Sequence, residues 1–183
     1  MRKANSIAAA AVMILFVFHL IWGAMELFGM IKGGSTFFRI MTYTLIGFVA
    51  LHTVFGIVLT ADTVRAMRRA GVSYYKENRL FWIRRISGFA LMAFIIVHVI
   101  LFHGQNSGGI YYLTLFGIPE LVSQILMVAA LLIHIAANIR PMRIAFGFSD
   151  KWNIRTDIAL VLSILLLLAG IAFIIYFLRW AAV

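Results

Sequence analysis

The sequence predicts an all-α membrane protein with five transmembrane helices. Of its 183 residues, 64% are hydrophobic and only 12% are charged, whereas soluble domains are about half apolar and about a quarter charged. Five segments are each apolar over about 20 residues, the length that a helix needs to cross about 30 Å of hydrocarbon. We therefore expect a single transmembrane domain that covers residues 1–183.

The predicted spans are Ser6–Met30, Phe37–Ala61, Ile86–His103, Ile118–Ile139 and Thr156–Leu178. Arg2 and Lys3 precede the first span, as they would in a signal peptide. That apolar run is too long for a signal peptide, and no small-residue cleavage site follows it. We therefore expect it to be retained as a helix.

The lysines and arginines predict how the protein lies in the membrane. Thirteen of the sixteen fall on one side of the predicted spans and three on the other. The thirteen are Arg2, Lys3, Arg65, Arg68, Arg69, Lys76, Arg79, Arg84, Arg85, Arg140, Arg143, Lys151 and Arg155, and the three are Lys32, Arg39 and Arg179. Because basic residues gather on the cytoplasmic side, we expect the N-terminus inside and the C-terminus outside, in the cytoplasmic (inner) membrane. The charges form no stripe on a soluble face, which argues against nucleic-acid binding.

Histidines are the candidate functional residues of the spans. The chain has no cysteine, which excludes disulfides, thiolate metal sites and cysteine nucleophiles. It has five histidines, and the predicted spans contain all of them: His19, His52, His98, His103 and His134. Ionisable side chains at membrane depth are costly and rare, so each one is a functional candidate. A hydrogen bond to a neighbouring helix would explain any single histidine, but one histidine on each of the first four helices favours a shared role.

The depths of four histidines define two levels. With a rise of about 1.5 Å per residue, His19 lies about 18 Å and His98 about 20 Å from the inner ends of their helices. His52 and His134 lie about 15 Å and about 9 Å from theirs. Since a low-spin b haem takes one neutral imidazole on each face, two levels of two histidines predict two haems.

Two glycines and two boundary residues add to this pattern. Gly23 and Gly56 follow their histidines by one helical turn, where a missing side chain lets a flat macrocycle approach or simply eases helix packing. His103 is about 140° around the helix from His98, so both cannot ligate one iron. His103 and Glu26 lie at the outer boundary, where they could exchange protons with a quinone. An interfacial histidine and a solvated carboxylate are the simpler alternatives.

Three short stretches carry a resemblance to a known family: Arg85-Ile-Ser87-Gly88 with His98 thirteen residues after the arginine, His52-Thr-Val-Phe-Gly56, and Phe18-His19-Leu20. They are similar to the Arg-x-Ser/Thr-Gly…His element, the His-x-Val-x-Gly of the second helix and the first ligand position of one family. This is the single-chain, five-helix dihaem cytochrome b subunit of succinate:quinone and quinol:fumarate oxidoreductases. In layout the resemblance covers nearly the whole chain.

The resemblance implies a four-helix haem-binding bundle with a fifth helix beside it. It pairs His19 with His98 at the iron of an outer haem b, and His52 with His134 at the iron of an inner haem b. These pairs agree with the depths estimated above.

The resemblance also implies partners and a substrate. Arg85 and Ser87 become candidate contacts for a quinone, menaquinone or ubiquinone, at the inner boundary. Such a subunit has no catalytic residues for succinate. It transfers electrons for a flavoprotein subunit and an iron–sulfur subunit on the cytoplasmic side, and the basic segment Val64–Arg85 is the expected docking face.

Two other functions remain open from the sequence. A cytochrome b subunit of a hydrogenase or formate dehydrogenase also carries two haems, but usually has four helices and docks its catalytic subunits outside. A transporter or assembly factor could use its histidines to bind metal or relay protons. The absence of Asp and Glu near the predicted bilayer centre argues against proton-coupled transport.

The charge asymmetry gives a testable topology. A reporter enzyme fused after Val183 should be active outside the cytoplasm, because an odd number of spans starts from an inner N-terminus. Reporter activity inside the cytoplasm would indicate an even number of spans.

Overall fold

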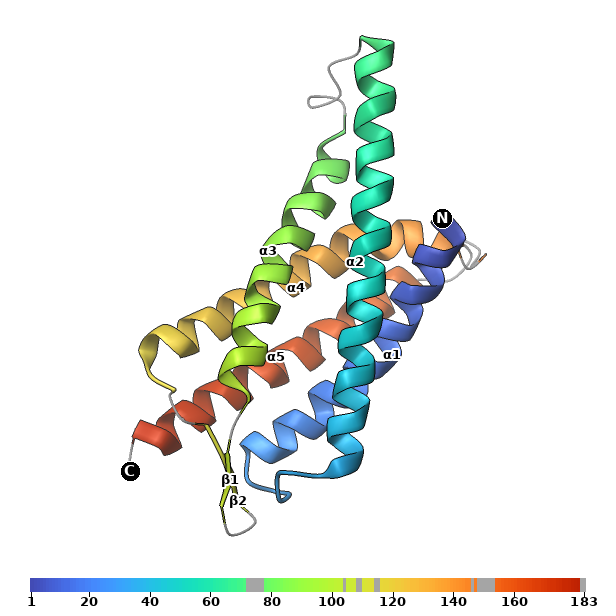
Figure 1. The fold of residues 1–183 in the computed structure, drawn as a ribbon. Coiled ribbons are helices and arrows are strands. Elements are labelled where there is room, and N and C mark those ends of the chain that lie inside the picture. Colours follow the sequence, from blue (N-terminus) through green and yellow to red (C-terminus); the bar gives the residue numbers. More distant parts are fainter. Residues whose placement is uncertain are drawn as a thin grey trace.

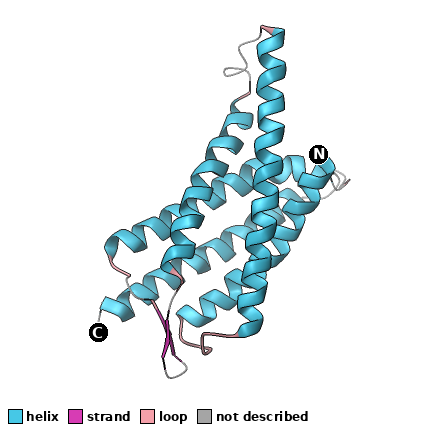
Figure 2. Ribbon diagram, viewed as in Figure 1, coloured by secondary structure: helices cyan, strands magenta, loops and turns pink. Residues whose placement is uncertain are grey.

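The computed structural model describes residues 1–71, 78–103, 105–107, 110–113, 116–145, 147 and 154–181. Its elements in chain order are α1 (Arg2–Leu27), α2 (Thr36–Ala70), α3 (Arg79–Leu101), β1 (Gln105–Ser107), β2 (Ile110–Tyr112), α4 (Ile118–Ala145) and α5 (Ile154–Ala181). The two strands pair antiparallel as a small hairpin between α3 and α4. Long helices otherwise make up the described chain (Figures 1 and 2).

All five helices are long and apolar enough to cross a membrane. The chain is therefore a multi-pass membrane protein, as its composition predicts. Its helices run back and forth, so the start of α1 and the end of α5 lie at opposite ends of the bundle (Figure 1). The α1–α2 connection and the hairpin share one end, called the outer end. The last turn of α2 and the first turn of α3 lie at the opposite, inner end.

The helices pack as two pairs joined by a fifth helix. α1 packs along α2, α3 packs along α4, and α5 contacts both α1 and α4. The buried apolar clusters lie beside α5: one contains Phe116 and Phe173, and the other contains Ile135 and Leu162. α2 and α3 approach each other through side chains, including a 3.2 Å contact from Thr53 Oγ1 to the sulfur of Met92. This packing leaves a cavity between the two pairs.

Several helix ends differ from the predicted spans. α2 continues to Ala70 rather than ending at Ala61, and α3 begins at Arg79 rather than at Ile86. The Asn78 side chain caps α3 by accepting from Phe81 N at 3.3 Å, and Gly71 ends α2 in the left-handed conformation. Hydropathy marks where a helix leaves hydrocarbon, whereas caps mark where its backbone hydrogen bonds stop.

The arginines predicted to lie between the second and third spans are therefore mostly helical. Arg84 and Arg85 belong to the second turn of α3. Of the basic residues counted for orientation, Lys76 and Lys151 lie outside the described residues.

His103 does not lie within a helix, contrary to the prediction. α3 ends at Leu101, and the chain turns at Phe102 before the hairpin begins. The apolar run extends past the last helical residue, so hydropathy overestimates the length of the span. His103 is exposed just beyond the outer end of α3.

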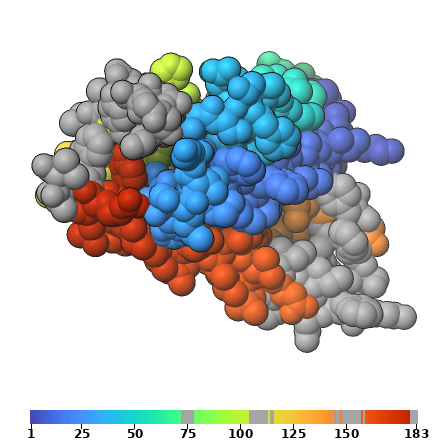
Figure 3. All heavy atoms as spheres, turned by 90° about the horizontal axis from the view of Figure 1, so that it is seen from below, coloured from blue at the N-terminus to red at the C-terminus, as the bar shows by residue number. Residues whose placement is uncertain are grey.

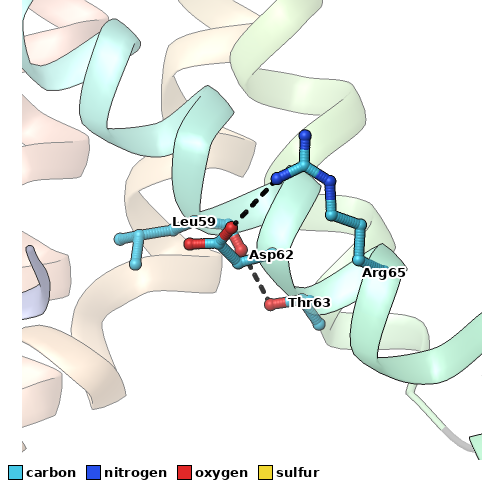
Figure 4. Close-up of polar contacts among 4 residues, drawn as sticks. All are labelled: Leu59, Asp62, Thr63 and Arg65. Carbon is cyan, nitrogen blue, oxygen red and sulfur yellow. Dashed lines mark hydrogen bonds and ion pairs between the residues drawn. The ribbon is translucent and has the colours of Figure 1, made fainter. Parts of the chain in front are cut away.

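The last turns of α2 form a basic extension at the inner end. Figure 1 shows α2 reaching past α1, α4 and α5. Within this extension, Arg65 pairs with Asp62 at 3.5 Å, and Thr63 donates to the carbonyl of Leu59 at 2.8 Å (Figure 4). An exposed pair of this kind stabilises a helix by only about 0.3–0.5 kcal/mol. Arg68 and Arg69 occupy the final turn, where positive charge complements the helix dipole.

Candidate cofactor-binding site

A cavity of about 1680 Å³ separates the α1–α2 pair from the α3–α4 pair. A pocket for one drug-sized ligand usually measures about 300–1,000 Å³, so this space is large enough for more than one. Its lining runs from Asn5 at the inner end to Lys32 at the outer end and is otherwise mostly aliphatic and aromatic. The polar exceptions include His19, His52, His98 and His134.

The outer pair consists of His19 on α1 and His98 on α3. Their ring centroids lie 6.1 Å apart, and the ring planes make an angle of 77°. His19 stacks on Phe38, with the centroids 5.3 Å apart, and its Nδ1 lies 3.3 Å from Thr42 Oγ1. His98 stacks on Phe102 at 4.4 Å. Two residues of α2 therefore hold the His19 ring, and Phe102, directly after α3, stacks on the His98 ring.

His98 is held further by a buried amide. Gln124 on α4 is completely buried, with 0% of its surface exposed, and its Oε1 lies 2.7 Å from His98 Nδ1. Its Nε2 donates to Ser123 Oγ at 3.0 Å, and Ser123 donates in turn to the carbonyl of Glu120 at 2.7 Å. Because this chain directs the amide carbonyl toward His98, Nδ1 must donate, and Nε2 keeps its lone pair.

The inner pair consists of His52 on α2 and His134 on α4. Their centroids lie 6.4 Å apart with an interplanar angle of 81°. Buried Ser87 lies 3.2 Å from His134 Nδ1 and donates its own hydroxyl proton to the carbonyl of Arg84 at 3.3 Å. With that proton used, the Ser87 oxygen accepts from His134 Nδ1, which again leaves Nε2 free to bind a metal.

The spacing of both pairs suits one metal between two imidazoles. An imidazole nitrogen binds first-row metals at about 2.0 Å, so two rings on opposite sides of one metal have centroids about 6 Å apart. Within the described residues, no group of three or more His, Asp and Glu side chains could hold a metal ion. A metal at either pair therefore needs further ligands in the plane between the rings, which is what a tetrapyrrole supplies.

Glycines shape the walls beside the histidines. Gly23 lines the cavity, and a methyl group added there would meet no atom within 4 Å. At Gly56 an added methyl would lie 3.8 Å from Arg85 Nη1. Gly88 acts differently, because a methyl group there would lie 3.2 Å from His134 Cε1. Gly23 leaves room for a ligand, whereas Gly88 lets His134 approach α3.

Two neighbouring arginines brace the inner end of the cavity. Pro141 lies inside α4 and has no N–H, so it cannot make the helical bond to the carbonyl of Ala137. Arg84 Nε donates to that carbonyl from α3 at 2.9 Å. Arg85 reaches the other way, to the carbonyl of Gly56 on α2 at 3.3 Å.

Arg85 keeps hydrogen-bonding capacity beyond this brace. Its guanidinium carbon lies 5.1 Å from the centroid of the Phe81 ring. Its Nε is buried and has no hydrogen-bond partner among the described residues. A buried donor of this kind calls for a partner, and Arg85 lines the cavity into which a ligand can bind.

The three basic residues assigned to the outer side, Lys32, Arg39 and Arg179, all line the outer end of the cavity, together with Glu26 and His103. Glu26 Oε1 accepts from Trp22 Nε1 at 3.1 Å. Arg179 Nη1 donates to the carbonyl of Phe28 at 2.7 Å, and Figure 3 shows the end of α5 beside the α1–α2 connection. The outer end of the cavity is thus polar, and Arg179 connects α5 to the segment after α1.

The structure brings together the sequence-predicted histidines and adds residues that the sequence analysis missed. Thr42, Ser123 and Gln124 hold two of the histidine rings but belong to no recognised motif. A glutamine within an apolar helix was the available signal, since buried amides in membranes need partners. Its partner depends on how α4 is rotated against α3, which hydropathy does not reveal.

Comparisons of the chain with protein-family models, with curated proteins and with solved structures find no match.

The close approach at Gly88 can be tested by adding bulk. Gly88→Val should lower the free energy of unfolding by about 1–3 kcal/mol, because the new methyl groups overlap the His134 ring. Chemical unfolding in mixed micelles measures this change. Gly47→Val is the matched control, since a methyl group at exposed Gly47 would meet nothing within 4 Å. Equal losses in both variants would show that valine in the helix, and not the contact with His134, is responsible.

Proposed function

We propose that this chain is the membrane-anchor cytochrome b subunit of a succinate dehydrogenase or fumarate reductase complex. It would carry electrons between an iron–sulfur subunit and a membrane quinone through two b haems. The observation that carries the proposal is the presence of two histidine pairs, with centroids 6.1 and 6.4 Å apart, in one cavity of about 1680 Å³.

The residues of the cavity suit two haems. When bound, each haem supplies an iron that accepts and releases one electron. His19 and His98 hold the iron of the outer haem, and His52 and His134 hold that of the inner one. Most of the cavity wall is apolar, and the space at Gly23 would leave room for the flat ring. Ser87 and Gln124 keep the Nε2 atoms of His134 and His98 free for the iron.

A quinone site at the inner boundary is supported by Arg85. Its buried, unpartnered Nε lines the cavity near the inner histidine pair and can donate to a quinone oxygen. Ser87 is the other candidate contact, but its hydroxyl already bonds His134 and the carbonyl of Arg84. We therefore assign the quinone contact to Arg85 and give Ser87 the role of positioning His134. His103 and Glu26 mark a second candidate quinone or proton site at the outer end.

The assignment to succinate or fumarate chemistry rests on the resemblance of the three sequence motifs. The basic extension of α2, with exposed Arg65, Arg68 and Arg69, suits an acidic soluble partner such as the proposed iron–sulfur subunit. A flavoprotein subunit would then complete the complex on the same side. Copurification of succinate dehydrogenase activity with the tagged chain tests this part separately from the haems.

The histidine pairs predict the haem content of variants. The native chain should bind two haems, and each of His19→Ala, His98→Ala, His52→Ala and His134→Ala should leave about one, because a pair needs both imidazoles. Pyridine haemochrome spectra measure the content, and redox titration identifies the component that remains.

The identity of the lost component is the sharper result. The His19 and His98 variants should lose the same component, and the His52 and His134 variants the other. Loss of one common component in the His19 and His52 variants would disprove the pairing, and a native chain without haem would disprove the whole proposal.

The role of Arg85 gives a kinetic prediction. Arg85→Leu should leave both haems bound but slow electron transfer to quinone tenfold or more, a barrier increase of about 1.4 kcal/mol. Stopped-flow oxidation of the reduced complex by quinone measures the rate. Arg39→Leu, at the outer end of the cavity, is the control and should change little. Normal turnover in the Arg85 variant with slow turnover in the Arg39 variant would place the quinone near His103 and Glu26.

A further inference from the structure

We propose that Gln124 is a positioning residue that lowers the reduction potential of the iron held by His19 and His98. Gln124 can act in this way only if the haems of the proposed function are present. The role follows from the bond between Gln124 Oε1 and His98 Nδ1. At 2.7 Å it is shorter than the contacts to the ring nitrogens of His134 and His19, which measure 3.2 and 3.3 Å.

Burial makes this bond persistent. Gln124 is 0% exposed, so its carbonyl cannot form a hydrogen bond to bulk water in place of the bond to His98. Leaving a buried acceptor without a partner costs about 1–3 kcal/mol. The other end of the amide is fixed by Ser123, which is itself fixed by the carbonyl of Glu120. The amide therefore cannot flip without losing two bonds.

The chemical effect acts through the imidazole. An acceptor on Nδ1–H increases the electron density of the ring and makes Nε2 a stronger donor to a metal. A ligand that donates its electron pair more strongly stabilises ferric iron more than ferrous iron, and this lowers the reduction potential of the iron. The property affected would be the potential at which a haem iron held by His19 and His98 takes up one electron, which would come from the proposed iron–sulfur partner or from quinol.

The contacts to Nδ1 of His134 and of His19 are weaker than the bond between Gln124 and His98. Ser87 Oγ lies 3.2 Å from His134 Nδ1, and Thr42 Oγ1 lies 3.3 Å from His19 Nδ1. Both are hydroxyl oxygens at longer distances, and a hydroxyl is a poorer acceptor than an amide carbonyl. The outer pair therefore differs from the inner pair in having an amide carbonyl, that of Gln124, as the acceptor for His98 Nδ1–H. The effect of Gln124 is confined to the outer pair.

Two substitutions of similar size separate this role from packing. Gln124→Met fills the same space without an acceptor, and Gln124→Glu offers a stronger, anionic one. The purified full chain is titrated by spectroelectrochemistry, and the outer component is the one that disappears in His19→Ala. In the Met variant the equilibrium constant for reducing that component should rise tenfold or more. This corresponds to a reduction potential higher by about 59 mV for a one-electron couple. The Glu variant should shift it the opposite way.

The inner component supplies the control. It should keep its potential in both Gln124 variants, whereas Ser87→Ala should shift the inner component alone. If the Met variant loses the outer haem, the Glu variant alone tests the proposal. A lower outer potential in that variant supports the role of Gln124, and a higher one overturns it.

The outcomes separate the two proposals. Full haem content with an unchanged outer potential in the Gln124 variants would overturn the role of Gln124 and leave the proposed function standing. Equal shifts of both components would also overturn it. A native chain that binds no haem would instead overturn the proposed function.

Discussion

Polar groups inside hydrocarbon must find their partners within the protein, and this constraint organises the bundle. In a membrane no water satisfies a stray imidazole, amide or carbonyl, and each one left alone costs several kcal/mol. Four helices therefore turn their histidines toward one internal space, where Thr42, Gln124 and Ser87 meet three of the rings. The α1–α2 and α3–α4 pairs stand apart around that space, and α5 covers the side where α1 and α4 come near.

The same constraint explains the inner end of the cavity. Pro141 leaves the carbonyl of Ala137 without its helical donor, and Arg84 supplies one from α3. Arg85 donates to the carbonyl of Gly56 on α2, which also accepts from Thr60 Oγ1. Two adjacent arginines thus tie three helices together beside the inner histidine pair. Packing at the inner end therefore depends on both arginines, and the proposed quinone contact depends on Arg85.

Much of the candidate site follows from local sequence. A rise of about 1.5 Å per residue is enough to group His19 with His98 and His52 with His134 by depth. The structure places the ring centroids of these two pairs 6.1 and 6.4 Å apart. The motif Arg85-Ile-Ser87-Gly88 contains groups that the structure places against His134. Its glycine is needed for close approach, which the sequence pattern alone does not explain.

By itself the sequence determined the number of spans, their approximate positions and the levels of the four histidines, because hydropathy and helical rise are local properties. It did not predict where α2 ends, where α3 begins or that His103 lies outside α3. The side chain of Asn78 caps the start of α3, and turns at Gly71 and Phe102 end α2 and α3, and hydropathy measures neither. Only the tertiary structure decided that Gln124 meets His98 and that Arg84 meets the carbonyl of Ala137. These contacts depend on the rotation of each helix about its axis, which is fixed by packing against neighbours distant in the chain.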